Sequence, residues 1–251
     1  MTRTLSSLLL TLMLIWPAGA WVAFSQTSDD SARGVIRLGV SAGLTTFALG
    51  DLRDFTADIV SGYKASGLPV ELEREYPPNL LAGAECLFVG LERWAFGLSG
   101  SYTWTSAYVL YADYAGTLDF HSKVEAISGY LVVQYSFATG CALQPFVDVR
   151  GGVSWVSLSI NETVDVTEYA GVQVSSDVSG DKAGFGGETS AGLRYPFGSF
   201  ALTGRLGYRF SNISEMEVKL SSSGQSQGSG TLGFDINASG FLGLLTLEAT
   251  L

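Results

Sequence analysis

Charged residues are scarce in this sequence, and the residue types that many kinds of site require are scarcer still. Asp, Glu, Lys and Arg make up 15% of 251 residues, and the formal net charge is −10. Without a basic stripe, this acidic balance argues against a nucleic-acid partner. One histidine and two separated cysteines make no zinc pattern. We therefore expect no metal and no cofactor, and two free thiols rather than a disulfide.

Long apolar runs are also missing beyond Phe24. No later stretch approaches the ~18–20 continuous apolar residues of a transmembrane helix. The start of the chain differs, because Arg3, an apolar core over 8–16 and small residues at 18–20 are typical of a secretory signal peptide. An uncleaved anchor is the alternative. We expect a signal peptide over 1–20 (or cleavage after Ser25), a short lead over 21–33 and one domain over 34–251.

What the sequence does have is 31 glycines, 47% hydrophobic residues and apolar side chains at alternate positions. In Trp94–Thr105, for example, large apolar residues alternate with Ser, Thr and Ala. Period-two alternation predicts strands with one oily face. The expected strands lie near 35–49, 80–91, 94–105, 127–137, 147–155, 188–197, 200–210 and 241–251, with a bulge near 237–240. Strand 80–91 fits less well, because both of its faces are apolar.

A secreted chain with these strands and no spanning helix can cross lipid only as a closed barrel, because lipid cannot satisfy open sheet edges. We predict an all-β fold, an eight-stranded antiparallel up-and-down transmembrane β-barrel. A soluble periplasmic, lipocalin-like barrel with its oily faces turned inward is the alternative. A closed barrel needs no partner to hide its edges, so a monomer is expected.

The expected connections alternate between short and long. Short connections fall near 91–93, 139–142 and Gly198, and long ones span 50–79, 106–120, 161–182 and 211–230. Outer-membrane barrels have short periplasmic turns and longer extracellular loops, so both ends of the domain are expected to be periplasmic. In the first long connection, Phe55, Ile59 and Tyr63 recur every four residues. This spacing permits a short amphipathic helix over 51–64, and an ordinary surface turn is equally compatible.

Two segments carry a resemblance to a known family. The run Tyr135–Phe137, Leu143–Phe146 and Gly151–Val153, and the segment Asp235–Phe241 before an alternating last strand, resemble the outer-membrane β-barrel domain family. This family includes the small OmpA- and OmpW-like, porin-like barrels of Gram-negative bacteria. The resemblance spans roughly residues 34–251. It implies an integral, multi-pass protein of the outer membrane, with membrane lipid and the barrel-insertion machinery as partners.

Two sets of residues are candidates for the site. Aromatic residues on the oily faces are expected at the membrane interface: Trp94, Tyr102, Trp104, Tyr135, Phe137, Trp155, Tyr195, Phe197, Phe200, Tyr208 and Phe210. Charges on the alternate faces must pair inside a filled barrel: Arg37, Glu85, Asp148, Arg150, Glu188, Arg194, Arg205, Arg209 and Glu248. Strand register predicts two pairs, Glu188 with Arg209 and Glu248 with Arg37.

No catalytic residue is expected, and the function that fits best is a structural role or loop-mediated binding. Acidic long loops would present an extracellular ligand site. The alternative is a narrow channel or transporter for small, hydrophobic solutes. A hydrolase at the outer rim ranks lower: Asp119 and His121 share a face, but Ser122 points to the opposite one.

Overall fold

Strands occupy most of the chain between Val35 and Thr250. The computed structural model describes residues 34–47, 49–65, 70, 76–91, 93–112, 116–137, 142–166, 172–223 and 231–251. The expected signal peptide and lead, residues 1–33, lie outside the described residues. No helix in the described part is long and apolar enough to cross a membrane.

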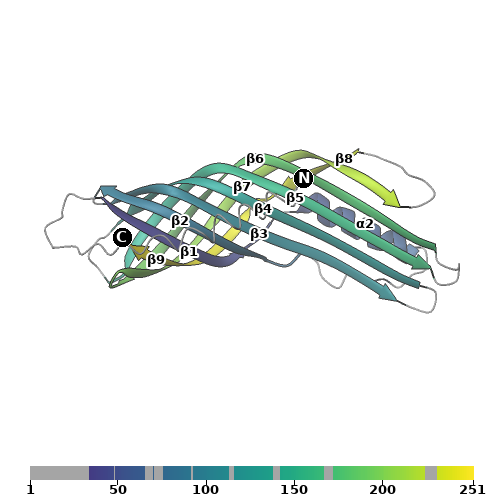
Figure 1. Cartoon of the computed structure of the whole chain (residues 1–251), viewed down its shortest axis with the longest axis horizontal. Coiled ribbons are helices and arrows are strands. Elements are labelled where there is room, and N and C mark those ends of the chain that lie inside the picture. The colour runs from purple at the N-terminus through teal and green to yellow at the C-terminus, as the bar shows by residue number, and fades with distance from the viewer. Residues whose placement is uncertain are drawn as a thin grey trace. The chain divides into compact units, whose positions relative to one another are not determined.

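Antiparallel strands joined in chain order make up almost the whole unit (Figure 1). They are β1 (Val35–Thr45), β2 (Asn79–Leu91), β3 (Trp94–Ala112), β4 (Gly116–Ser136), β5 (Gln144–Val166), β6 (Val172–Phe197), β7 (Phe200–Ser223), β8 (Thr231–Asn237) and β9 (Gly240–Thr250). Strands β1 to β7 each pair with the next, and β9 pairs with both β7 and β1. These pairings close a ring of β1 to β7 and β9, so the predicted eight-stranded up-and-down barrel is confirmed.

The last strand of the barrel is broken in two. β8 pairs with β7, and β9 then pairs with β7 and β1. Between them, the Ala238 amide donates to the Ser211 carbonyl at 3.0 Å. A Cβ on Gly240 would lie 1.8 Å from the Thr46 carbonyl oxygen, so only glycine lets the chain restart here. A strand break therefore stands where the sequence predicted a bulge.

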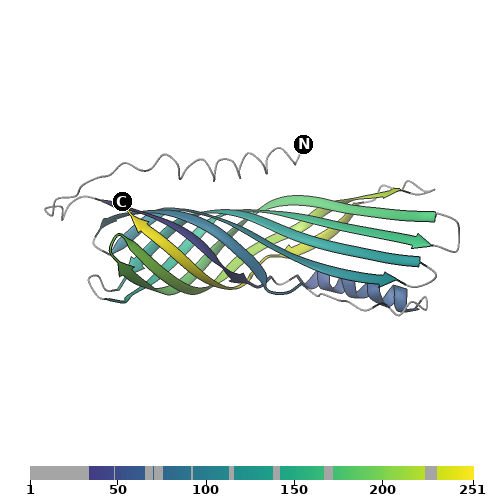
Figure 2. The ribbon, with the colours of Figure 1, turned by 60° about the horizontal axis from the view of Figure 1, so that its bottom comes forward.

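Strand lengths show that the barrel continues past the ring. β1 and β9 have 11 residues each, which matches the ~9–11 residues of a tilted strand that crosses a bilayer. β6 has 26 residues and β7 has 24. Beyond the ends of β1 and β9, the strands β3 to β8 continue as a sheet that we call the extension (Figure 2).

The prediction of long loops at 106–120, 161–182 and 211–230 is therefore wrong. β3 and β4 stay paired as far as Ala112 and Thr117, and β5 and β6 as far as Val166 and Val172. Most of these residues are strand. The sequence predicted loops there because the outward faces of β4 and β5 change from apolar to polar, so the continuous apolar face that identified the strands ends.

β4 shows this inversion without any change of phase. Its outward positions read Thr, Asp, His, Lys and Glu over 117–125, then Ile, Gly, Leu, Val and Tyr over 127–135. Its inward positions read Leu, Phe, Ser, Val and Ala over 118–126, then Ser, Tyr, Val and Gln over 128–134. Along β4, the extension thus has the polar exterior and apolar interior of a water-soluble sheet, whereas the ring has an apolar exterior and a more polar interior.

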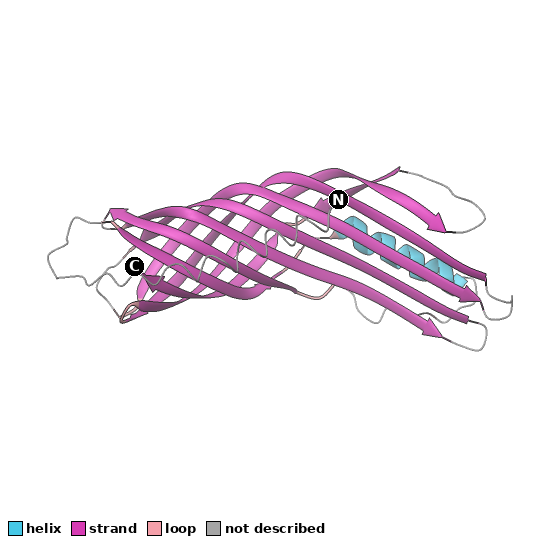
Figure 3. Cartoon of the chain, in the orientation of Figure 1, coloured by secondary structure: helices cyan, strands magenta, loops and turns pink. Residues whose placement is uncertain are grey.

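One helix, α2 (Gly50–Ala65), accompanies the extension (Figure 3). Leu52 and Val60 are buried in the same apolar cluster as residues of β3, β4 and β5, with Phe55 and Ile59 packed against it. The opposite face, including Asp58, is exposed. Of the two alternatives for this segment the structure has the helix, and the helix packs into the extension where β1 and β2 do not continue.

Candidate functional site

The interior of the ring holds all nine charged residues that the sequence places on inward faces. Eight are buried, and Arg194 is half-buried. They form two groups. The mid-barrel cluster contains Glu85, Asp148, Arg150, Glu188, Arg205 and Arg209, and the turn-end cluster contains Arg37, Arg194 and Glu248, near the short turns of the ring.

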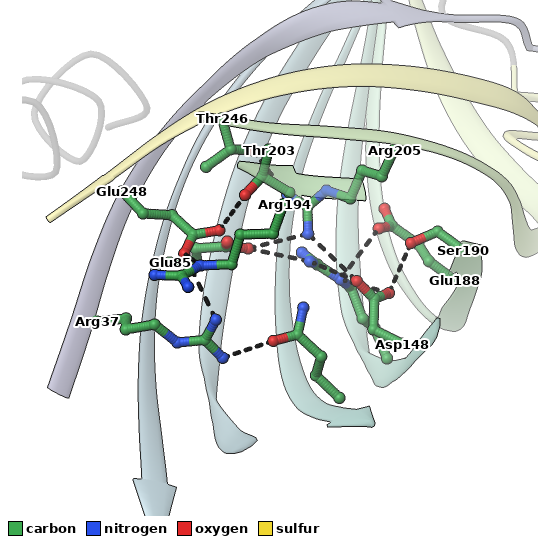
Figure 4. Close-up of polar contacts among 12 residues, drawn as sticks. Arg37, Glu85, Asp148, Glu188, Ser190, Arg194, Thr203, Arg205, Thr246 and Glu248 are labelled. Atoms are coloured by element: carbon green, nitrogen blue, oxygen red, sulfur yellow. Dashed lines mark hydrogen bonds and ion pairs between the residues drawn. The ribbon is translucent and has the colours of Figure 1, made fainter. Parts of the chain in front are cut away.

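In the mid-barrel cluster, two arginines share the same two acids (Figure 4). Arg150 Nη2 lies 3.0 Å from Glu85 Oε2 and 3.2 Å from Asp148 Oδ2. Arg205 Nη1 lies 3.0 Å and 3.4 Å from the same two oxygens. Ser190 donates to Asp148 at 2.8 Å. These contacts join β2, β5, β6 and β7 across the lumen.

Arg209 completes the mid-barrel cluster. Its Nε donates to Glu188 Oε1 at 2.7 Å, and its Nη groups donate to Ser101 at 3.2 Å and to Thr103 at 3.3 Å. Its guanidinium also lies 5.9 Å from the centre of the Tyr130 ring. A side chain only 1% exposed is thus held from β3, β4 and β6.

The turn-end cluster has two arginines around one acid. Glu248 Oε2 lies 2.8 Å from Arg194 Nε and 3.5 Å from Arg37 Nη1. Thr203 donates to the other oxygen of this carboxylate. The remaining acceptors are uncharged. Arg37 donates to the Gln134 amide oxygen at 2.6 Å, and Arg194 donates to that of Gln144 at 3.0 Å.

Both pairs expected from register, Glu188 with Arg209 and Glu248 with Arg37, are in contact. The contacts of Arg205 with Glu85 and Asp148 were not foreseen, because β7 is not a neighbour of β2 or β5. Strand register predicts contacts between adjacent strands only. To predict contacts across the lumen, the arrangement of the strands in the barrel's cross-section must also be known.

A small cavity lies beside the mid-barrel cluster. It measures about 10 Å³ and is lined by Glu85, Arg150, Glu188, Arg205, Arg209 and several hydroxyl groups. Beside this cluster the lumen therefore has space for about one water molecule.

The interior of the extension is apolar. Its buried cluster, the extension core, contains Phe47, Leu49, Leu52, Val60, Val70, Tyr76, Ala107, Val109, Leu118, Phe120, Val124, Ala126, Val156, Leu158, Ile160, Val178, Ile213, Met216, Val218 and Ala238. Two smaller clusters lie in the ring, one around Leu81 and one around Leu87. They explain why β2 is apolar on both faces: its inward leucines pack inside the barrel.

Two tyrosines tie α2 and its flanking segment to the extension. The Tyr76 hydroxyl donates to Ser122 Oγ at 2.8 Å and lies 3.2 Å from Thr56 Oγ1. The Tyr63 hydroxyl donates to Glu162. Burial raises the pKa of Tyr76 and is also the largest cause of the raised pKa of Tyr63. Both phenols are thus held in their neutral, hydrogen-bonding form.

The eleven aromatic residues expected at the interface lie on the outward face; Trp104 and Tyr135 are half-buried and the others exposed. They lie in two groups, and several members of each group contact one another. Trp94 and Tyr135, near the short turns, have ring centres 4.8 Å apart. Tyr102 and Trp104, near the start of the extension, have ring centres 5.2 Å apart. Aliphatic side chains such as Leu98 and Leu131, together with glycines, occupy most outward positions between the groups.

His121 and Ser122 lie on opposite faces of β4 and do not form a nucleophile and base, whereas Asp119 and His121 share the outward face, as expected. His121 is outward on β4, with its ring 6.1 Å from that of Tyr108. Ser122 is buried on the opposite face and bound by Tyr76. Within the described ranges no three His, Cys, Asp or Glu side chains form a metal-binding group. Cys86 is a free, exposed thiol, and Cys141 lies outside the described residues.

The outer surface of the ring defines the class of protein. Leu131, Leu206 and Phe241 are 69%, 74% and 72% exposed, and the other outward positions of the ring carry similar apolar side chains. Water would not tolerate an apolar belt of this extent around buried charges, whereas lipid requires it. The soluble-barrel alternative is therefore wrong. The chain is an integral, multi-pass transmembrane β-barrel, the class of the outer membrane.

No protein-family model matches the chain, and no curated protein matches it. Solved outer-membrane proteins are similar to it. A major outer membrane protein from Thermus thermophilus is 11% identical, with 86% of this chain and 99% of that chain covered and a TM-score of 0.48. Outer membrane protein AlkL is 16% identical, with 91% and 95% covered and a TM-score of 0.42. The N-terminal β-barrel domain of Pseudomonas aeruginosa OprF is 12% identical, with 87% and 100% covered and a TM-score of 0.34. These likenesses are of fold.

Proposed function

We propose that this protein is a non-enzymatic outer-membrane barrel, sealed along its axis, that holds a rigid binding platform outside the membrane. The observation that carries the proposal is that two kinds of side chain fill the interior one after the other along the barrel axis. Buried ion pairs occupy the ring, and the extension core with α2 occupies the space beyond it.

The two fillings block different solutes. An ion or a polar molecule would have to break the contacts of Arg150 and Arg205 and then enter the apolar extension core. Breaking a buried pair costs about 3–5 kcal/mol, because it leaves an uncompensated charge. An apolar solute would have to displace α2 and then cross the charged ring. A sealed barrel suits an anchor better than a passage.

The platform is the outward face of the extension. His121, Asn161 and Asp177 face one another across β4, β5 and β6, and Lys123 and Ser159 form part of the next row. Strand backbone holds these side chains in a fixed grid, unlike side chains on mobile loops. The extracellular ligand that we expected to bind acidic loops is thus assigned to a sheet surface. The interface aromatics fix the ring in lipid, and the closed ring lets the protein act as a monomer.

Planar-bilayer recording tests the seal. The wild-type protein should give no reproducible conductance steps. Replacing 50–65 with a Gly/Ser linker should also leave it silent, and so should the charge-balanced double variant Glu85→Ala/Arg205→Ala, because one seal remains in each. Combining the two changes should give steps. Conductance in the wild-type protein would overturn the proposal.

The alternative role is a narrow path for small hydrophobic solutes, and the apolar interior of the extension is the observation that favours it. It predicts that liposomes containing the wild-type protein take up a hydrophobic dye faster than protein-free liposomes. It also predicts that bulky replacements in the extension core slow this uptake. Equal uptake with and without protein supports the sealed platform.

The non-enzymatic part of the proposal rests on the opposed faces of His121 and Ser122. The wild-type protein is expected to be inactive in lipase, deacylase and protease assays. Activity that His121→Ala abolishes would instead establish the outer-rim hydrolase.

A further inference from the structure

The small cavity beside the mid-barrel cluster is bordered by every wall of the ring. Its lining includes residues of all eight strands that close the ring, among them Ser41 from β1, Ser99 from β3 and Arg205 from β7. Strands β3 and β7 are separated by three strands in either direction around the ring, so they lie on opposite walls. The cavity is therefore a space that polar side chains from opposite walls share.

Two residues of this lining have buried polar atoms without a hydrogen-bond partner among the described residues. Arg205 is 4% exposed, and its Nε lacks an acceptor. Its Nη1 donates to Glu85 and Asp148, and its Nη2 donates to Thr246. Ser99 Oγ lacks a partner as well. A buried donor without an acceptor is costly, particularly on a charged group, so both atoms favour an occupant in the cavity.

Size and charge limit what this occupant is. The volume of about 10 Å³ admits roughly one molecule the size of water. Charged groups of both signs line the cavity: Glu85, Glu188, Arg150, Arg205 and Arg209. A cation would lie beside guanidiniums and an anion beside carboxylates, so repulsion opposes an ion of either sign. A neutral molecule that both donates and accepts hydrogen bonds meets these conditions.

We propose that the cavity is a binding site for one water molecule, which accepts a hydrogen bond from Arg205 Nε and bonds Ser99 Oγ. An arginine Nε–H can only donate, whereas a serine hydroxyl can donate or accept, so water suits both. Buried waters make about three hydrogen bonds, and the hydroxyls of Ser41 and Ser101 in the lining offer further partners. The water links β3 to β7 across the lumen. This site is independent of the proposed platform, which lies outside the ring.

Proton–nitrogen NMR of the whole protein in detergent micelles tests the site. The Arg205 Nε–H should show a nuclear Overhauser effect to a long-lived water proton. Laboratory-frame and rotating-frame measurements separate such a contact from proton exchange. Ser99→Val removes the hydroxyl and puts methyl groups into the cavity, so the contact should be lost. Ser159→Val makes the same change on the outward face of the extension and should leave the contact intact. A contact absent from the wild-type protein, or kept in Ser99→Val, would overturn the proposal.

Two further measurements hold even where Ser99→Val fails to fold. In wild-type crystals soaked in sodium bromide, a water predicts density within hydrogen-bonding distance of Arg205 Nε and Ser99 Oγ, without a bromide anomalous peak. Bromide in the cavity would make this an anion site and contradict the assignment, as would the lack of any density there. Ser99→Ala keeps the space but removes one partner of the water, so it should lower the Tm. Ser159→Ala should leave the Tm unchanged, and equal shifts in both variants would count against the site.

Discussion

At the scale of single residues, polar side chains connect helix α2, the sheet of the extension and the segment that follows the helix. Tyr76 is the clearest case. It is 4% exposed, and its hydroxyl meets Ser122 from β4 and Thr56 from α2 inside an otherwise apolar core. The Thr56 hydroxyl also donates to the Leu52 carbonyl within the helix. One phenol thus connects the segment after α2, the helix and the sheet.

This contact makes the packing of α2 sensitive to alkali. Burial raises the pKa of Tyr76 above its ordinary value of about 10. Its stabilisation is fully present below pH ~10 and is lost as pH rises through the folded-state pKa. Near-UV circular dichroism from pH 8 to pH 12 should show a transition that Tyr76→Phe diminishes. At neutral pH, Tyr76→Phe should lower the free energy of unfolding by about 1 kcal/mol. An identical alkaline transition in the variant would contradict this role.

At the scale of elements, the long strand β4 consists of two halves with opposite polarity. Parity is kept across the boundary, so the same face of β4 carries Glu125 and then Ile127. The half of β4 in the ring presents apolar side chains to lipid, and the half in the extension presents polar side chains to water. One strand therefore fits both environments without a bulge.

Arginine substitutions along the outward face of β4 should measure where the solvent changes. Leu131→Arg places a cation at a position that is 69% exposed within the apolar belt and should cost about 2–4 kcal/mol. Thr117→Arg, exposed on the same face in the extension, should cost close to nothing. Urea unfolding in lipid vesicles gives both values. Similar costs at the two positions would mean that the boundary is misplaced.

The packing of α2 can be tested with a buried charge. Leu52→Asp puts a carboxylate into the extension core. Burying it without a partner costs several kcal/mol, so the substitution should detach the helix. Ala57→Asp makes the same chemical change on the exposed face and serves as the control. Limited proteolysis should cut within 50–65 in Leu52→Asp only, while heat-modifiable gel migration shows an intact ring in both variants. Equal protection of both variants would contradict the packing of α2.

The strands of the ring could be predicted from the sequence because lipid makes one face continuously apolar. The pair Glu188–Arg209 could be predicted because β6 and β7 are neighbours. The extension could not be found by the same pattern, because its outward face is polar and its glycine- and serine-rich segments read as loops. The position of α2 could not be predicted either, because its apolar stripe does not identify the surface against which it packs.

At the scale of the whole molecule, the extension lies at one end of the ring and the short turns at the other. If the short turns are periplasmic, a membrane-impermeant thiol reagent added to intact cells should label Asn161→Cys and should not label Ser199→Cys. Both variants are made in a Cys86→Ser/Cys141→Ser background. Asn161 is exposed on the extension, and Ser199 lies in the turn between β6 and β7. The reverse labelling would place the extension in the periplasm.

The barrel also has a fixed hydrophobic height. It is set by the two groups of outward aromatic residues and by the polar outward positions of β4, which end at Glu125. Helical membrane proteins adapt to a thicker or thinner bilayer by tilting, at a cost of fractions of a kcal/mol per ångström. A closed ring that continues into a packed, water-exposed sheet cannot tilt one strand at a time. The thickness of the bilayer must change instead, so the lipid around this protein should take the thickness of its apolar belt.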